Sequence, residues 1–94
     1  MDQEASLELL RLQHEFPGKF LFKAIGKNQD EFPERVVAAV RETLCHDFDS
    51  PFELKHTPHG RHVSVSVEPW VDSAEQVIAV YAKVRHLEGL VMMM

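Results

Sequence analysis

One short stretch of the sequence alternates polar and apolar residues without interruption. It spans His62–Glu68, reads HVSVSVE, and has a β-branched valine at every apolar position. Successive side chains of a strand point to opposite faces, so a period of two predicts a strand with one buried face. We therefore expect a central strand whose Val63, Val65 and Val67 side chains enter the core.

Length and composition limit what can surround this strand. Ninety-four residues suit one domain, and a chain of this size buries roughly 60–65% of its unfolded surface. Its apolar runs are far shorter than the ~20 residues that cross a bilayer, and its acidic N-terminus does not resemble a secretory signal. The single cysteine, Cys45, excludes an internal disulfide and suits a reducing compartment. We expect a cytoplasmic protein with no membrane partner.

The charge balance argues against nucleic acid as a partner. Ten Lys and Arg residues stand against fifteen Asp and Glu residues, which gives a net charge of −5. A phosphate backbone is repelled by such a surface, and the basic residues are scattered singly rather than gathered in a block. The acidic balance by itself indicates only solubility.

Patterns typical of regular structure flank the central strand on both sides. They predict a helix over Glu4–His14, a strand over Lys19–Gly26, a helix over Asp30–Leu44, a strand over Phe52–Thr57, a helix from Ser73 to Gly89 and a strand over Leu90–Met94. Asp30 or Asn28 is expected to cap the second helix, and residues 73–76 to form a capping box at the third. Residues 26–29 and 58–60 read as turns, Pro69 as the end of the central strand and Trp70 as a loop anchor.

After the first helix, the order of elements is βαββαβ. Two right-handed crossovers that share a hairpin give an α+β, ferredoxin-like sandwich, with an antiparallel sheet of order 4-1-3-2 and two helices on one face. Residues 1–94 then form one domain, in which 1–15 are an N-terminal helical extension and 16–94 the core. Seven side chains should face the helices: Phe20, Phe22, Phe52, Leu54, Val63, Val65 and Val67.

The opposite face of the sheet is expected to be largely polar. It would carry Ser64, Ser66, Glu68, Lys23, Glu53 and Lys55, next to an apolar strip from Leu21, Ile25 and alternate residues of 90–94. Such a strip requires a cover. The N-terminal helix, a second copy of the chain or a ligand would each supply one.

Several short motifs, taken in order, resemble the YbeD-like family of small bacterial proteins. They are Glu15-Phe16-Pro17 followed by Phe20, Phe22, Lys23 and Gly26, then Gly60 with Ser64–Val67, then Gln76-Val77 and the apolar last strand. The resemblance covers residues 12–94 and implies a ferredoxin-like fold similar to regulatory ACT domains. It also implies a regulatory or lipoate-binding role, through association with lipoate genes, and supplies no catalytic residue. His62 departs from the family, which tends to have a bulkier aromatic residue there.

Three histidines at regular spacing, His56, His59 and His62, are the most evident candidate site. Three imidazoles can hold a zinc ion and leave one position open. If Leu54 and Val63 both point inward, however, His56 points inward and His62 outward, which separates them unless a bulge intervenes. The sequence therefore favours hairpin histidines over a metal site, and we predict no metal and no cofactor.

Two further candidates have simpler explanations. Ser64 and Ser66, with Lys23, would suit a small anion, but serines are normal on the solvated face of a strand. Cys45 follows a predicted helix, whose C-terminal partial negative charge disfavours a reactive thiolate.

Known activities of this fold also lack their residues in this chain. Metallochaperones of the fold resemble one another in a Cys-x-x-Cys loop, which a single cysteine excludes, and acylphosphatases have an arginine where residues 26–29 have none. RNA-recognition domains stack bases on aromatic residues at the positions of Ser64 and Ser66. Lys23 lies inside a strand rather than at a hairpin tip, so it is a poor lipoyl acceptor.

These observations favour a non-enzymatic regulatory or binding module, with an unknown protein or a small molecule as its partner. Self-association through an edge strand or the open face is a corollary. The alternative is a small metal-dependent enzyme that uses the hairpin histidines His56, His59 and His62.

Overall fold

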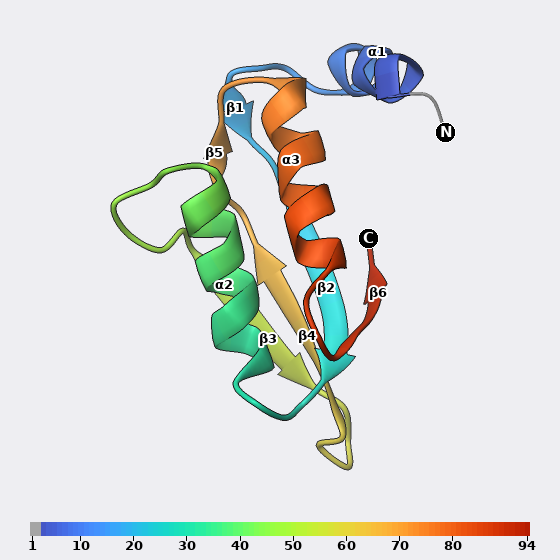
Figure 1. The fold of residues 1–94 in the computed structure, drawn as a ribbon, viewed down its shortest axis with the longest axis vertical. Helices are drawn as coiled ribbons and strands as arrows, with labels where there is room; N and C mark the ends of the chain where they lie inside the picture. Colours follow the sequence, from blue (N-terminus) through green and yellow to red (C-terminus); the bar gives the residue numbers. More distant parts are fainter. Residues whose placement is uncertain (1–2) are drawn as a thin grey trace.

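The computed structural model describes residues 3–94 and contains three helices and two antiparallel sheets (Figure 1). The elements are α1 (Gln3–Gln13), β1 (Gly18–Lys19), β2 (Phe22–Lys27), α2 (Phe32–Thr43), β3 (Phe52–His56), β4 (His62–Val67), β5 (Trp70–Val71), α3 (Ala74–Arg85) and β6 (Leu90–Met93). The main sheet has the order β3-β4-β2-β6, and α2 and α3 cover one of its faces. Since β2, β3, β4 and β6 are the four predicted strands, the ferredoxin-like fold and its strand order are confirmed.

The central strand is β4, as its alternating pattern predicts. It lies between β3 and β2, and the exposed fractions of Val63, Val65 and Val67 are 1%, 0% and 0%. Phe22 and Ala24 of β2 are equally buried beside them, because β2 pairs with β4 so that Phe22 lies opposite Val67 and Ala24 opposite Val65. The core therefore forms between this face of the sheet and the apolar sides of α2 and α3.

The strand predicted over Lys19–Gly26 is in fact two strands in two sheets. Its first residues form β1, which pairs with β5 so that Lys19 lies opposite Trp70, and β2 begins only at Phe22. Pro69 ends β4 as predicted, but the chain resumes at once as β5, and the Phe20 N–H donates to the Pro69 carbonyl at 3.0 Å. Trp70 is therefore part of a strand, not a loop anchor. At its other end β2 continues through Lys27, one residue beyond the predicted strand and into the predicted turn.

The predicted side-chain cap of α2 is wrong, and the capping box predicted at α3 forms only in part. Asp30 and Glu31 both have left-handed backbones, with φ of 54° and 56°, and no side chain caps α2, where the Phe32 N–H donates to the Gln29 carbonyl at 3.1 Å. Arg35, one turn into the helix, donates from Nε to the Asp30 carbonyl at 2.9 Å and from Nη1 to the Glu88 carbonyl at 3.0 Å. At α3 the Gln76 Oε1 accepts from the Asp72 N–H at 2.7 Å, and Ser73 makes no side-chain cap bond.

Phe52 and Leu54 lie on the predicted face but not in the core. They pair with Val67 and Val65, so they point to the helix side, yet their exposed fractions are 50% and 37%. β3 is an edge strand, and a groove of about 310 Å³ remains between it and the Val37 side of α2. The sequence shows which way a side chain points, but the helix above it decides how deeply it is buried.

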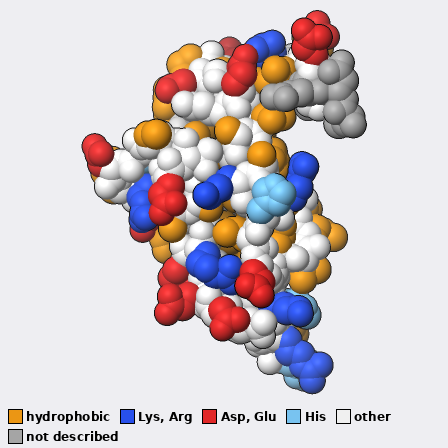
Figure 2. All heavy atoms as spheres, in the orientation of Figure 1, with side chains coloured by type: hydrophobic (Ala, Val, Ile, Leu, Met, Phe, Trp, Pro, Cys, Tyr) orange, Lys and Arg blue, Asp and Glu red, His pale blue; other side chains and the backbone are white. Residues whose placement is uncertain are grey.

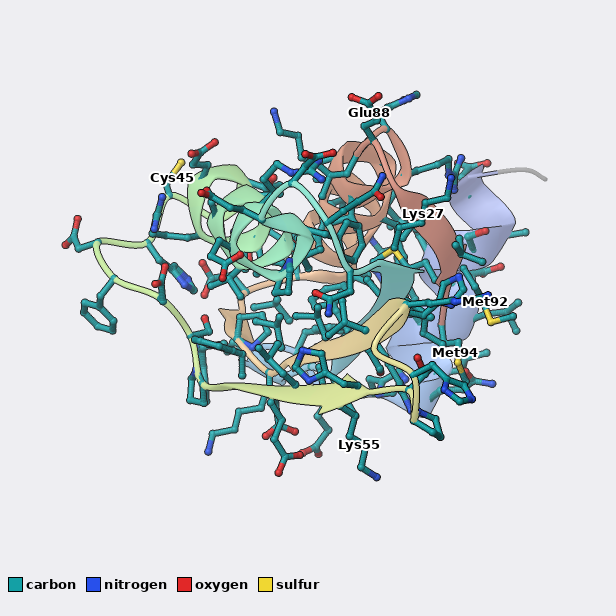
Figure 3. The ribbon with its side chains drawn as sticks, turned by 90° about the horizontal axis from the view of Figure 1, so that it is seen from below. Lys27, Cys45, Lys55, Glu88, Met92 and Met94 are labelled. Carbon is teal, nitrogen blue, oxygen red and sulfur yellow. The ribbon has the colours of Figure 1, made fainter. Side chains whose placement is uncertain are left out.

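The first helix does not cover the open face of the sheet. α1 lies off one end of the molecule (Figure 1), where Arg11 forms a 2.7 Å ion pair with Glu75 of α3. The predicted apolar strip stays exposed in the described chain, with fractions of 54% for Leu21, 53% for Met92 and 60% for Met94. Figure 3 shows Met92 and Met94 on the outer side of the molecule. Among residues 3–94, no helix combines the length and apolarity that crossing a membrane requires.

The last strand is fastened to the core by Tyr81 of α3. Its hydroxyl donates to the Met94 carbonyl at 3.5 Å, and its ring meets Phe22 edge-on, with centroids 5.3 Å apart. Burial raises the pKa of the Tyr81 phenol above its ordinary value of 10.0. The shift favours the protonated phenol, which is the form that donates this hydrogen bond.

Candidate functional site

A groove of about 450 Å³ lies where the α2–β3 loop meets the β1–β5 ribbon. Its apolar walls come from Phe48, Pro51, Pro69 and Trp70, and its titratable lining residues are Lys19, Cys45, His46, Asp47 and Glu68. Phe48 is 77% exposed and Trp70 is 53% exposed, so two aromatic side chains stand largely uncovered at one site. We refer to this feature as the aromatic groove.

The small ribbon fixes the direction of Trp70. Val71, the next residue of β5, is fully buried, so the alternation of a strand turns Trp70 to the opposite, exposed side. The ladder places Lys19 directly opposite Trp70, and residues opposite one another in an antiparallel pair share a face. An ammonium group therefore accompanies the indole at the groove.

The α2–β3 loop, which presents Phe48, is held at both ends. At the end of α2, the Cys45 N–H donates to the Glu42 carbonyl at 3.2 Å and the His46 N–H to the Arg41 carbonyl at 3.0 Å, which is a Schellman motif. Further along, Asp49 forms a 2.7 Å ion pair with Arg41, and the Pro51 carbonyl accepts from the Glu68 N–H at 3.1 Å. The wall of the groove thus has a defined position before any ligand arrives.

Cys45 occupies the one position of that motif at which glycine is usual. Its φ is 56°, a left-handed backbone that costs a residue with a Cβ atom about 1–2 kcal/mol. We expect Cys45→Gly to stabilise the protein by about 0.5–1 kcal/mol, after the greater freedom of glycine in the unfolded chain is subtracted. Urea unfolding should show a higher midpoint with an unchanged slope. Cys45→Ala retains the strain, so a glycine variant no more stable than the alanine variant would contradict this account.

Single charges of both signs line the aromatic groove. Lys19 stands against Asp47 and Glu68, and no ion pair of Lys19 is found within residues 3–94. Figure 2 likewise shows Lys and Arg side chains interspersed with Asp and Glu across the helix-covered face. The groove therefore offers mainly apolar contact surface, with single charges at its border to orient a ligand.

The structure does not assemble the three hairpin histidines. His56 pairs with Val63 and so shares its helix-side face, whereas His62 is the neighbour of Val63 along β4 and points to the opposite face. His59 lies in the turn between the two strands. Within the described range, no three His, Cys, Asp or Glu side chains are grouped in a way that would hold a metal ion.

The two serines and Lys23 do share a face, as the sequence implies. Lys23 lies opposite Ser66, and Ile25 opposite Ser64, on the open side of the sheet. On the other side of Ser66 stands Glu53, so a carboxylate offsets the charge that Lys23 would offer an anion. Cys45 is exposed and lines the aromatic groove at the C-terminus of α2.

Phe48 and Trp70 are the residues that sequence reasoning missed. Neither belongs to a periodic pattern, and each follows a residue that usually marks a loop, Asp47 and Pro69. An isolated aromatic residue in a polar segment was the available signal. It does not reveal that two such segments, distant in sequence, meet at one groove.

Comparison with known proteins identifies relatives of this chain. The model of the family described as "Protein of unknown function (DUF493)" matches residues 12–94. A "UPF0250 protein" of Shewanella piezotolerans is 36% identical over 76 residues, which cover 81% of this chain and 84% of the relative. A "UPF0250 protein" of Pasteurella multocida is 29% identical over 80 residues, which cover 85% and 89%. The predicted YbeD-like resemblance is thereby confirmed: the chain belongs to the DUF493 family of small bacterial proteins.

Proposed function

We propose that this protein is a cytosolic, non-enzymatic binding module that holds a small ligand with an apolar body in the aromatic groove. One observation carries the proposal. Phe48 and Trp70, 77% and 53% exposed, stand at the walls of a groove of about 450 Å³ whose backbone is held by hydrogen bonds and an ion pair. Leaving two large aromatic side chains in water forgoes the free energy of burial, which a bound ligand would recover.

The size and rigidity of the groove suit a small molecule. Ligand sites commonly measure about 300–1,000 Å³, with apolar walls and a few polar groups that set orientation. A site whose walls are already in place loses little entropy when a ligand binds. Lys19, opposite Trp70 in the ribbon, is the cation of the groove that would face a carboxylate at the end of an acyl chain or an amino acid, while Asp47 and Glu68 oppose an anion from the same lining. The family resemblance adds lipoate to the ligands of this class.

The proposed function is non-enzymatic for a chemical reason. Covalent or acid–base catalysis needs a nucleophile and a base within hydrogen-bonding reach, or a metal with an open position. The hairpin histidines on which a metal-dependent enzyme would depend lie on two faces of the sheet. Replacing His56, His59 and His62 together should therefore leave a cellular phenotype of the protein unchanged.

Trp70 is the only tryptophan of the chain, so its fluorescence reports directly on the groove. We expect octanoate, lipoate or an apolar amino acid to change the Trp70 emission in a saturable way and to raise the melting temperature. Phe48→Ala keeps the reporter and should weaken this binding about tenfold, since the apolar surface that Phe48 buries against a ligand contributes about 1.4 kcal/mol or more.

Leu12→Ala is the matched control, because Leu12 is 82% exposed on α1 and lies outside the groove. It should leave the binding curve unchanged. If no probe of this class shifts either the emission or the melting temperature, the aromatic groove is not a small-molecule site.

A further inference from the structure

The outer edge of β3 is the basis of this inference. β3 ends the main sheet and, within residues 3–94, pairs only with β4. All five of its residues are exposed, and Phe52 and Leu54 expose apolar surface on the helix side. An uncovered edge of this kind is a template for another strand.

The hydrogen bonds of the hairpin show which backbone groups face outward. The Thr57 N–H donates to the His62 carbonyl at 3.1 Å, and the Glu68 N–H donates to the Pro51 carbonyl at 3.1 Å. Because the direction alternates along a strand, Glu53 and Lys55 also bond toward β4. The N–H and C=O groups of Phe52, Leu54 and His56 therefore point away from the sheet, toward solvent.

We propose that this edge binds a second copy of the same chain, with β3 antiparallel to β3 and a two-fold axis at Leu54. In this register every outward group finds a partner: Phe52 lies opposite His56 of the second copy, and Leu54 opposite Leu54. The two four-stranded sheets then become one continuous sheet. Pro58, the next outward-facing position after His56, has no N–H and so ends the pairing at the end of β3.

The charges of β3 are complementary to themselves in this register and in no neighbouring one. Glu53 lies opposite Lys55 of the second copy, and Lys55 opposite Glu53, on the open face. The outward N–H and C=O groups of the two β3 strands lie opposite one another only if the register shifts from this one by an even number of residues. The two nearest shifts place Glu53 opposite Glu53, or Lys55 opposite Lys55, and like charges directly opposite are destabilising.

The apolar side chains of β3 also fit a second copy of the chain in this register. Leu54 and Phe52 border the groove of about 310 Å³ beneath α2, and the two-fold axis at Leu54 brings each Leu54 against its copy. Figure 3 shows Lys55 directed away from the helices, so the charged pairs and the apolar contact form on different faces of the joined sheet. The side chains on both faces of β3 are thus compatible with a second copy of the chain.

Charge reversal tests the proposal in solution. Sedimentation equilibrium of the wild type should show dimers of twice 10.8 kDa. Glu53→Lys alone, or Lys55→Glu alone, places like charges opposite one another twice and should weaken the dimer about tenfold. An equimolar mixture of these two variants restores both opposite-charge pairs, so it should dimerise more strongly than either variant alone. Lys83→Glu, on the exposed side of α3, should change nothing.

The outcomes separate this dimer from other arrangements. Both substitutions lie at exposed positions, so each variant should keep its fold, and circular dichroism checks this. A wild type that stays at 10.8 kDa at the highest concentration reached would overturn the proposal. A dimer that the two single variants leave unweakened, or a mixture no more associated than its components, would overturn it as well.

Discussion

Replacing Gly26 by alanine is expected to destabilise the protein by about 2–4 kcal/mol. A Cβ atom on Gly26 would lie against the ring of Phe32, 2.7 Å from Cε1 and closer still to Cε2 and Cζ. Carbon atoms that are not bonded pack at about 3.5–4.0 Å. Phe32 is fully buried at the start of α2, and its ring also meets the Arg35 guanidinium, 5.7 Å from the ring centroid. Neither the ring nor the strand can give way without disturbing the core.

The measurement is urea unfolding of four proteins: wild type, Gly26→Ala, Phe32→Leu and the double variant. Phe32→Leu alone should cost about 1–2 kcal/mol for lost packing. In the double variant the smaller side chain leaves room for the new methyl group. The double variant should therefore lose less unfolding free energy than the sum of the losses in the two single variants. A Gly26→Ala variant within about 0.5 kcal/mol of wild type would show that Phe32 does not need the space above Gly26.

Val65→Asp should have a larger effect still and leave the chain unfolded at 25 °C. Val65 is fully buried in the middle of β4, between Leu54 on β3 and Ala24 on β2. An unpaired carboxylate there costs several kcal/mol, and a domain of this size is stable by only about 5–10 kcal/mol. Far-UV circular dichroism and the loss of a cooperative thermal transition would report the result.

Ser64→Asp is the matched control, one residue away on the same strand. Its side chain points to the open face, where Lys55 lies opposite and supplies a favourable charge. It should change the free energy of unfolding by less than about 1 kcal/mol. If the two aspartate variants were equally stable, the direction of every side chain in β4 would be in question, and with it the core.

The topology of the main sheet was predictable because its signals are local. Alternation of two residue classes decides which face of a strand is buried, and β4 carries that alternation over its whole length. The order of elements then leaves few topologies, since crossovers are right-handed and hairpin strands pair. Both inferences needed only residues close together in the sequence.

The contacts at the start of α2 were not predictable, because one partner comes from elsewhere in the chain. Asp30 has a side chain that suits a cap, but its backbone is left-handed, and its carbonyl accepts a hydrogen bond from the Arg35 Nε. The same guanidinium bonds the Glu88 carbonyl, more than fifty residues away in the chain. A local pattern does not contain such a bond, so the usual capping residues were misleading here.

Burial on the edge strand and the aromatic groove were equally outside the reach of the sequence. Phe52 and Leu54 point as predicted, yet the position of α2 leaves them half uncovered. Phe48 and Trp70 form a groove only because the α2–β3 loop and the β1–β5 ribbon meet at one end of the molecule. Pro69 predicted the end of a strand, but it did not predict that a second, smaller sheet begins there.

The sequence by itself therefore determined the four strands of the main sheet, their order, the direction of their side chains and the family. Each of these follows from periodicity or from short motifs along the chain. Only the tertiary structure decided that Gly26 lies under the ring of Phe32, that Phe52 and Leu54 of β3 stay largely exposed, that a second sheet forms from β1 and β5, and that two aromatic residues share a groove. These features are set by distances between segments that the chain brings together on folding, and no residue pattern within one segment records them.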